Sequence, residues 1–374
     1  MLAIARAWRD RGHEVVVVTA PRVRTEVKGL GFDFIGLPRI EGVGGEGFRT
    51  ALRDGNQDQR QQAVAQKLLE MAAVWTTPLA GVIEAYEPQV VLRETTSLAA
   101  LFAGELTHTP VGTFDYALRP RGPIVDRVLS DQFAAFRREL GLPAEPDLAA
   151  LNRWLTLAGA PPEWFRAGDL TPTTHLIQPP ELRPWEGESV DRLVQSLDDR
   201  PLVWATLGTA FNAEPGVWPM VLEGLAEVDA NVVATVGPDL DPAVFGPQPS
   251  HVRLERFISQ ALILPHCTAT LTHGGYGSLM GALRQGLPCV VVPLPAGDNW
   301  RNATKVERLG AGIAIHEDSR SAGAVRKAVA AVLTEPSYQE AARRLAASIA
   351  SLPPTSHGAT LLERLARERQ PIHS

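Results

Sequence analysis

The pattern of apolar and polar residues in the first third of the chain alternates between helix and strand. Apolar residues recur at helical spacing over Leu2–Arg11, and the unbroken run Val15–Val18 is typical of a strand buried on both faces of a parallel sheet. The same order returns as a strand at Pro88–Leu92, a helix at Ser97–Thr107 and a strand at Val111–Phe114. This rhythm predicts an α/β domain.

A change in composition then divides the chain near its middle. Prolines at 179–184 are followed by a charged stretch at 186–199, and the alternation of strands and helices restarts at residue 201. We therefore expect an α/β fold of two Rossmann-like, doubly wound domains, residues 1–185 and 201–355, joined by a linker at 186–200. A ligand site is expected in the cleft between them, and a last amphipathic helix within residues 356–374.

The chain opens inside a helix, whereas a doubly wound domain normally opens with a strand. Without that strand, its neighbours in the middle of the sheet would leave buried backbone groups unpaired. Two explanations stay open: the sheet has one strand fewer, or Met1 is an internal start and the natural protein begins further upstream. We favour the second.

Composition excludes several classes of protein. The net charge of −6 and the pI near 5.9 argue against nucleic-acid binding. No apolar run reaches the roughly 18 residues of a membrane span, and no secretory signal is recognisable, so we expect a cytoplasmic protein without a membrane span. Cys267 and Cys289 lack metal-ligand spacing and are interpreted as buried thiols.

The segment Leu271–Gly286 carries the most informative chemistry. A buried strand is expected to end at Thr272, a glycine-rich turn follows, and Ser278 opens a helix. This arrangement directs backbone N–H groups and the positive end of a helix dipole at one point, which is typical of an anion site. Without Lys or Arg before Leu283, recognition depends on N–H groups, the Ser278 hydroxyl and the imidazole of His273. The glycines of the turn are Gly274, Gly275 and Gly277.

The longer run HGGYGSLMGALRQGLPCVVVPLPAGDNWRNATKVERLGAGIAI resembles the donor-binding signature of family-1 glycosyltransferases of the GT-B fold. It is most similar to the bacterial branch that decorates macrolides, enediynes and other natural products. Four further stretches resemble the same family in order: His13–Thr19 and Val90–Leu106 in the acceptor domain, and Pro201–Asn212 and Val252–Cys267 in the donor domain. The resemblance also implies that the helix at 356–374 crosses back onto the first domain.

This resemblance implies a role for each matching residue of the donor domain. His273 contacts a phosphate, and Asp298 with Asn299 holds the hydroxyls of the sugar. The family usually has Gln where this chain has Asn299, which puts glucose as the donor sugar in doubt; a simple turn is the alternative for this pair. The remaining implied positions are Gly274, Gly275 and Ser278 on the diphosphate, Gly208 and Thr209 on the facing turn, and Phe257 and Ile258 beside the base.

Catalysis in the family is inverting and uses a histidine base oriented by a carboxylate. Glu94, which follows a strand, resembles that carboxylate, although a solvated surface carboxylate is the alternative interpretation. The histidine has no counterpart here and would belong to the absent opening segment. His13 lies before the second strand, at the end of the strand that faces away from the expected cleft. Asp239 and Asp241 imitate a metal-binding DxD but lie in a proline-flanked turn, so no metal is expected.

The resemblance therefore implies an enzyme that moves a sugar from a UDP- or dTDP-sugar to a hydroxyl of a small hydrophobic natural product, as in antibiotic biosynthesis. The nucleotide sugar is a co-substrate, and no cofactor is expected. The alternative is a homologue without catalysis that acts as a nucleotide-sugar-binding or auxiliary protein. A nucleotide-sugar epimerase is disfavoured, because the additional acid–base carboxylates that it needs are not found in the donor domain.

Overall fold

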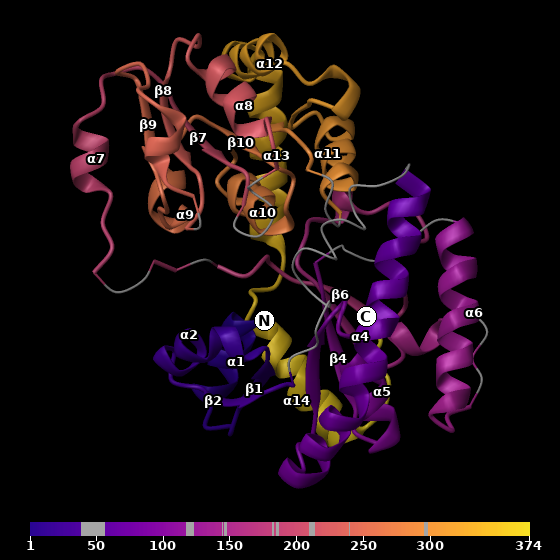
Figure 1. Ribbon diagram of the computed structural model, residues 1–374. Helices are drawn as coiled ribbons and strands as arrows, with labels where there is room; N and C mark the ends of the chain where they lie inside the picture. Colours follow the sequence, from indigo (N-terminus) through magenta and orange to yellow (C-terminus); the bar gives the residue numbers. More distant parts are fainter. Residues whose placement is uncertain are drawn as a thin grey trace. The chain divides into compact units, whose positions relative to one another are not determined.

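The computed structural model describes residues 1–38, 57–116, 123–143, 145, 148–181, 183–184, 187–208, 214–238, 240–294 and 298–374. The chain forms two compact units, each coloured by sequence in Figure 1. Unit 1 comprises Met1–Ala160, Phe165–Pro180 and Pro353–Ser374, and unit 2 comprises Pro161–Trp164 and Glu181–Leu352. Thr209 and Asp239 lie outside the described residues.

Unit 1 contains parallel strands in two groups. One group is a four-stranded sheet of order β3-β4-β5-β6 and the other is the pair β1-β2. The strands are β1 (Val16–Thr19), β2 (Asp33–Gly36), β3 (Val91–Glu94), β4 (Val111–Asp115), β5 (Leu155–Ala158) and β6 (Thr174–Leu176). The helices are α1 (Leu2–Arg9), α2 (Arg24–Gly29), α4 (Gln57–Tyr86), α5 (Leu98–Leu106), α6 (Pro123–Glu139) and α14 (His357–Glu368), with short 3-10 helices at Pro21–Val23 and Ala149–Asn152.

The valine run of β1 is less buried than its sequence predicts. All four residues of Val16–Thr19 are only half-buried, whereas a strand covered on both faces was expected. The physical reason is pairing: among the described residues β1 has a ladder with β2 alone. The expectation of a doubly covered strand is therefore wrong for β1.

The helix α4 has a segment, Gln62–Tyr86, that is long and apolar enough to cross a membrane by length and composition alone. A core helix of a soluble protein can have the same length and apolar composition. Here Ala65, Leu68, Ala72 and Ile83 of α4 are buried in a cluster with α5, so the apolar side chains already have packing partners. The absence of a membrane span stays a prediction.

The last helix, α14, belongs to unit 1. Its Leu361, Leu362 and Leu365 are buried in a cluster with Phe114 and Leu157 of the sheet. A Cβ on Gly112 would overlap the Leu362 side chain, so β4 carries a glycine where the helix packs on it. The amphipathic spacing of these leucines is what directs one face of α14 onto the sheet.

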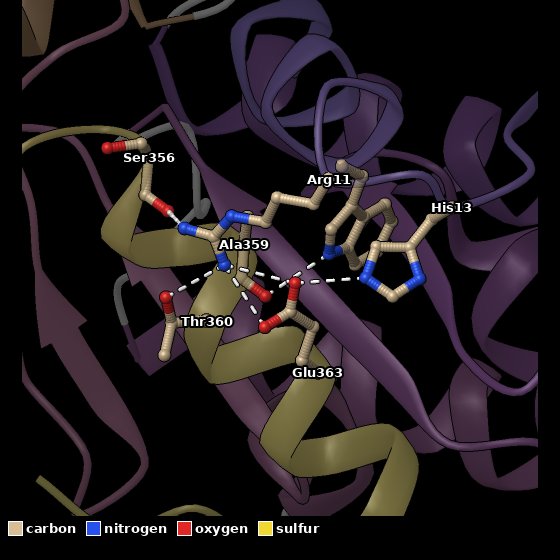
Figure 2. Close-up of polar contacts among 7 residues, drawn as sticks. Arg11, His13, Ser356, Ala359, Thr360 and Glu363 are labelled. Carbon is tan, nitrogen blue, oxygen red and sulfur yellow. Dashed lines mark hydrogen bonds and ion pairs between the residues drawn. The ribbon is translucent and has the colours of Figure 1, made fainter.

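Polar contacts also join the start of the chain to α14 (Figure 2). Arg11 Nη1 lies 3.0 Å from both Glu363 carboxylate oxygens, and His13 Nε2 lies 3.0 Å from Glu363 Oε1. Trp8 Nε1 donates to the Ala359 carbonyl at 3.1 Å. His13 is thus bound to α14, before β1 begins.

Unit 2 is built on one parallel sheet of order β12-β11-β10-β7-β8-β9. The strands are β7 (Leu202–Thr206), β8 (Asn231–Thr235), β9 (Val252–Glu255), β10 (Ala269–Thr272), β11 (Cys289–Val291) and β12 (Gly312–Ala314). The helices are α7 (Asp191–Gln195), α8 (Val217–Leu225), α9 (Gln260–Ile263), α10 (Tyr276–Arg284), α11 (Asn299–Arg308), α12 (Ala322–Thr334) and α13 (Pro336–Ser351), with 3-10 helices at Pro162–Trp164, Pro242–Phe245, Leu264–His266 and Glu317–Ser319.

The core of unit 2 follows from the solid apolar runs of its strands. Every residue of β7, β8, β10 and β11 is buried, and α8 and α12 pack on the sheet through Trp218, Val221, Val325 and Val329. Strands covered on both faces are typical of doubly wound α/β domains. The polar groups that remain accessible are therefore concentrated in the loops at the ends of the strands.

Candidate functional site

The strand order of unit 2 reverses between β10 and β7, which are neighbours in the sheet but not in sequence. Thr206 of β7 pairs with Thr272 of β10, so both strands end at the same level. Gly208 and His273 follow directly after them. Loops that leave the carboxyl ends of strands at such a reversal line the usual ligand crevice of an open α/β sheet.

The imidazole of His273 is packed between two glycines from different loops. A Cβ on Gly208 would lie 2.7 Å from His273 Cε1, and a Cβ on Gly275 would overlap His273 Nε2. Gly208 also has a φ of +82°, which side chains rarely adopt. These two glycines therefore leave space for the histidine ring. The sequence analysis assigned them only the close approach of a phosphate to the backbone.

Burial governs the charge of His273. It lowers the pKa of the imidazole to about 4, and a hydrogen bond to the Thr206 backbone opposes this shift. The ring is therefore neutral at pH 7, and its single N–H is directed to the Thr206 backbone. The backbone amides of the glycine turn beside the ring are the donors suited to recognition of an anion by hydrogen bonds.

The helix α10 begins just beyond this histidine without a side-chain cap. Its N-cap is Gly275, its first turn contains no acidic residue, and the first backbone bond runs from Leu279 N to the Gly275 carbonyl. The amides that precede Leu279 lie at the positive end of the helix dipole. A Cβ on Gly277 would meet no heavy atom within 4 Å, so the space beside this turn is open among the described residues.

A second helix N-terminus lies against the same turn. Asp298 and Asn299 begin α11, and a Cβ on Gly274, whose φ is +93°, would come within 2.6 Å of the Asn299 carbonyl oxygen. Both side chains are buried, with 7% of Asp298 and 4% of Asn299 exposed. The two residues predicted for the sugar therefore directly adjoin the turn predicted for the diphosphate.

The environment of Asp298 is unusual for a carboxylate. Burial raises its pKa to about 7, while a hydrogen bond from Asn302 and the charges of Lys305 and Arg301 oppose the shift. Asn302 Nδ2 lies 2.5 Å from Asp298 Oδ2. Asn302 was missed by the sequence reasoning, although a polar residue on the buried side of α11, beside Ala303 and Val306, was a usable signal.

The predicted base-binding residues stand apart from this cluster. Phe257 and Ile258 follow β9, which lies two strands from β7 in the sheet. Like Gly208, they come after the carboxyl end of a strand. Phe257 is a large apolar side chain with 49% exposure, which suits a surface for stacking on a planar ring. Ile258 is half-buried, and no contact between this pair and His273 is among those described.

Glu94 ends β3 in unit 1 and is held by local contacts. Its carboxylate accepts from Thr96 N at 2.7 Å and from Thr96 Oγ1 at 2.5 Å. Burial, and then the charge of Glu94, raises the pKa of Tyr116 to about 12. The carboxylate of Glu94 is thus half-buried and fixed by Thr96, and its orienting role stays a prediction.

The described residues form no group of three or more His, Cys, Asp or Glu side chains that could hold a metal ion. Asp241 accepts from Ala243 N at 3.1 Å and lies 3.6 Å from Arg256, so it has local partners. Cys289 is buried and Cys267 is partly buried, both as free thiols. Burial raises the pKa of each thiol to about 12.

Comparisons with known proteins give this geometry a context. Residues 219–365 match the family described as erythromycin biosynthesis protein CIII-like, C-terminal domain. The 4'-demethylrebeccamycin synthase of Lentzea aerocolonigenes is 29% identical over 406 residues, covering 92% of this chain and 91% of that protein. The L-demethylnoviosyl transferase of Streptomyces niveus is 28% identical over 377 residues, covering 99% and 94%.

Solved structures agree on the fold. The spinosyn rhamnosyltransferase SpnG superposes with a TM-score of 0.79 at 22% identity, covering 98% of this chain and 95% of that one. The glycosyltransferase VinC, in complex with dTDP, gives 0.74 at 20% identity, with coverages of 98% and 96%. The chain therefore has the GT-B fold, as its sequence predicts.

The names of the relatives indicate the class of enzyme to which this chain is similar. Residues 219–365 of this chain match the EryCIII-like C-terminal domain, and its homologues are natural-product glycosyltransferases. The family resemblance inferred from the HGGYGS run is confirmed.

Proposed function

We propose that this protein transfers a sugar from a nucleoside-diphosphate donor to a hydroxyl group of a small hydrophobic natural product, with inversion at the anomeric carbon. The observation that carries the proposal is the open, uncapped N-terminus of α10 beside the neutral His273. Amides fixed in this position are suited to a diphosphate. UDP and dTDP are the expected nucleotides, and the dTDP complexes of VinC and SpnG support the second.

The chemistry proposed for this site is a single displacement. The acceptor oxygen forms a bond to the anomeric carbon, the bond from that carbon to the diphosphate breaks, and a base receives the hydroxyl proton. Negative charge then develops on the leaving diphosphate, where the amides of α10 and its dipole stabilise it without reorganisation. Asp298 and Asn299 adjoin this point and are proposed to bind the sugar hydroxyls. Glu94 is proposed to orient the base.

A thermal-shift measurement tests the nucleotide site. We expect dTDP or UDP at about 100 times its Kd to stabilise the protein by about 2.7 kcal/mol, an increase of several degrees in Tm. His273→Ala is expected to abolish this increase, because the imidazole and the packing of the two glycines around it are lost. His316→Ala, which removes an exposed histidine of the same unit, is the matched control and should keep it. The absence of a shift with either nucleotide would refute the proposal.

The role of Glu94 is tested by turnover. Glu94→Gln is expected to lower kcat for sugar transfer by about 100-fold, since a neutral amide cannot stabilise the proton that leaves the acceptor hydroxyl. The dTDP-induced increase in Tm should stay as in the wild type, because the predicted nucleotide contacts belong to unit 2. The measurement is transfer from a panel of dTDP- and UDP-sugars to a panel of hydroxylated aromatic and macrolide acceptors. Glu70→Gln on α4 is the control, and an unchanged kcat in Glu94→Gln would remove the assignment.

The auxiliary-protein alternative is not favoured by the relatives, whose names describe a synthase and a transferase. Its distinguishing property is nucleotide binding without turnover. The acceptor panel therefore decides between the two functions in the same experiment.

A further inference from the structure

Asn302 is the most deeply buried polar residue around the candidate site, with 0% exposure. It lies in the second turn of α11, four residues after Asp298, and its backbone N–H donates to the Asp298 carbonyl at 2.9 Å. A fully buried amide is costly unless its hydrogen bonds are made. Asn302 makes them through Nδ2, whereas its Oδ1 has no hydrogen-bond partner among the described residues. Its partners therefore indicate why it is there.

The side-chain amide of Asn302 donates to two acceptors from different parts of the site. Nδ2 lies 2.9 Å from the carbonyl oxygen of Gly274 and 2.5 Å from Asp298 Oδ2. The two N–H bonds of Nδ2 thus donate one hydrogen bond to the Gly274 carbonyl and one to the Asp298 carboxylate. The reverse orientation of the amide would set its oxygen against both acceptors, so the network itself fixes which way the amide points.

We propose that Asn302 is a positioning residue that joins the sugar-binding carboxylate of Asp298 to the diphosphate-binding turn at Gly274. This inference rests on the proposed function for its biochemical meaning, and on geometry alone for the two contacts. Asn302 touches neither the nucleotide nor the sugar in this assignment and acts through its two partners.

Each contact has a separate physical consequence. The bond to Asp298 favours the ionised carboxylate, which burial disfavours, and therefore keeps a good acceptor for sugar hydroxyls near neutral pH. The bond to Gly274 fixes the carbonyl of a residue in the left-handed region and hence the direction of the amides that follow it. The charged groups that act on the Asp298 carboxyl are Arg301 and Lys305 of α11.

Asn302→Leu removes both N–H donors and keeps a side chain that branches at Cγ. We expect the pKa of Asp298 to rise by about one unit or more, the usual effect of losing a hydrogen bond to a charged group. The affinity for dTDP is expected to fall by about tenfold, because the turn is no longer fixed. Carboxyl carbon chemical shifts of labelled aspartate report the pKa, and calorimetry with dTDP reports the affinity. Thr304→Val, which removes an exposed side-chain contact on the same helix, should change neither.

Asn302→Asp separates positioning from mere support of the fold. It keeps the shape of the side chain, but the introduced carboxyl group can donate only when protonated. The two adjacent carboxyl groups should then share a proton and titrate in two well-separated steps, with dTDP affinity recovering as the pH falls into the range where the proton is held. A residue needed only to fill space would give no such recovery.

The outcomes distinguish this inference from the proposed function. An unchanged Asp298 titration in Asn302→Leu, or unchanged dTDP affinity in a folded Asn302→Leu, would overturn the positioning role. If Asn302→Leu does not fold, the two-step titration and pH-dependent recovery of Asn302→Asp decide instead. If the wild type binds neither dTDP nor UDP, the proposed function fails, while the Asp298 titration still reports whether Asn302 holds the carboxylate.

Discussion

Replacing Gly277 by valine is expected to weaken dTDP binding at least about 100-fold while leaving Tm close to that of the wild type. Gly277 is the second residue of α10, and a Cβ there meets no heavy atom within 4 Å, so the folded protein has room for the side chain. The Cα–Cβ bonds of a helix tilt toward its N-terminus. The valine methyl groups would therefore stand in front of the amides that are proposed to bind the diphosphate.

The chain offers a closely matched control for this variant. Gly323 is the second residue of α12, and a Cβ there also meets no heavy atom within 4 Å. Gly323→Val should have the same small effect on Tm and no effect on dTDP affinity, both measured by calorimetry and thermal melting. Equal dTDP affinity in Gly277→Val and Gly323→Val would show that the nucleotide does not use the N-terminus of α10.

Asp298→Asn is expected to lower sugar transfer by about 100-fold or more and, at the same time, to stabilise the protein at alkaline pH. The loss of activity follows from replacing the carboxylate proposed to accept hydroxyl hydrogen bonds, since bonds to a charged acceptor are the stronger kind. The gain in stability follows from removing a buried charge. Steady-state kinetics with the dTDP- or UDP-sugar that the wild type transfers, and denaturant titrations at several pH values, measure the two effects.

The sign of the pH dependence follows from the pKa of Asp298, which is about 7 in the folded protein against an ordinary value of 3.8. The folded state holds the proton more tightly, so the carboxylate costs stability as the pH rises from about 4 to 7. The advantage of Asp298→Asn should therefore be full above pH 7, on the order of 4 kcal/mol, and vanish near pH 4. An advantage that grew on acidification would contradict the assigned shift.

The titration of His273 changes the stability in the opposite direction to that of Asp298 over part of the same pH range. Its pKa of about 4 lies below the ordinary 6.5, so the unfolded chain takes up a proton first and stability falls as the pH drops from 6.5 toward 4. In the wild type, the opposite contributions of Asp298 and His273 to the pH dependence of stability partly cancel. Asp298→Asn should therefore lose stability more steeply than the wild type on acidification below pH 6.5.

The strand, turn and helix around His273 could be predicted from sequence because these elements are contiguous. A buried strand, a histidine, three glycines and a helix within Leu271–Gly286 need only local geometry to converge on one point, and the structure has β10 and α10 in these places. The valine run of β1 shows the limit of the same reasoning. Local pattern predicts that a segment is a strand, but the number of strands that cover it depends on pairing with distant residues.

The sequence by itself determined two α/β parts, the glycine-rich turn and the family resemblance, because each depends on residues close together along the chain. Only the tertiary structure decided that Gly208 accommodates the ring of His273 and that Asn302 joins Gly274 to Asp298. The first of these contacts depends on β7 lying beside β10, and the second on α11 packing against the turn. Burial then set the pKa values of His273 and Asp298, since the cost of charging a group depends on everything packed around it.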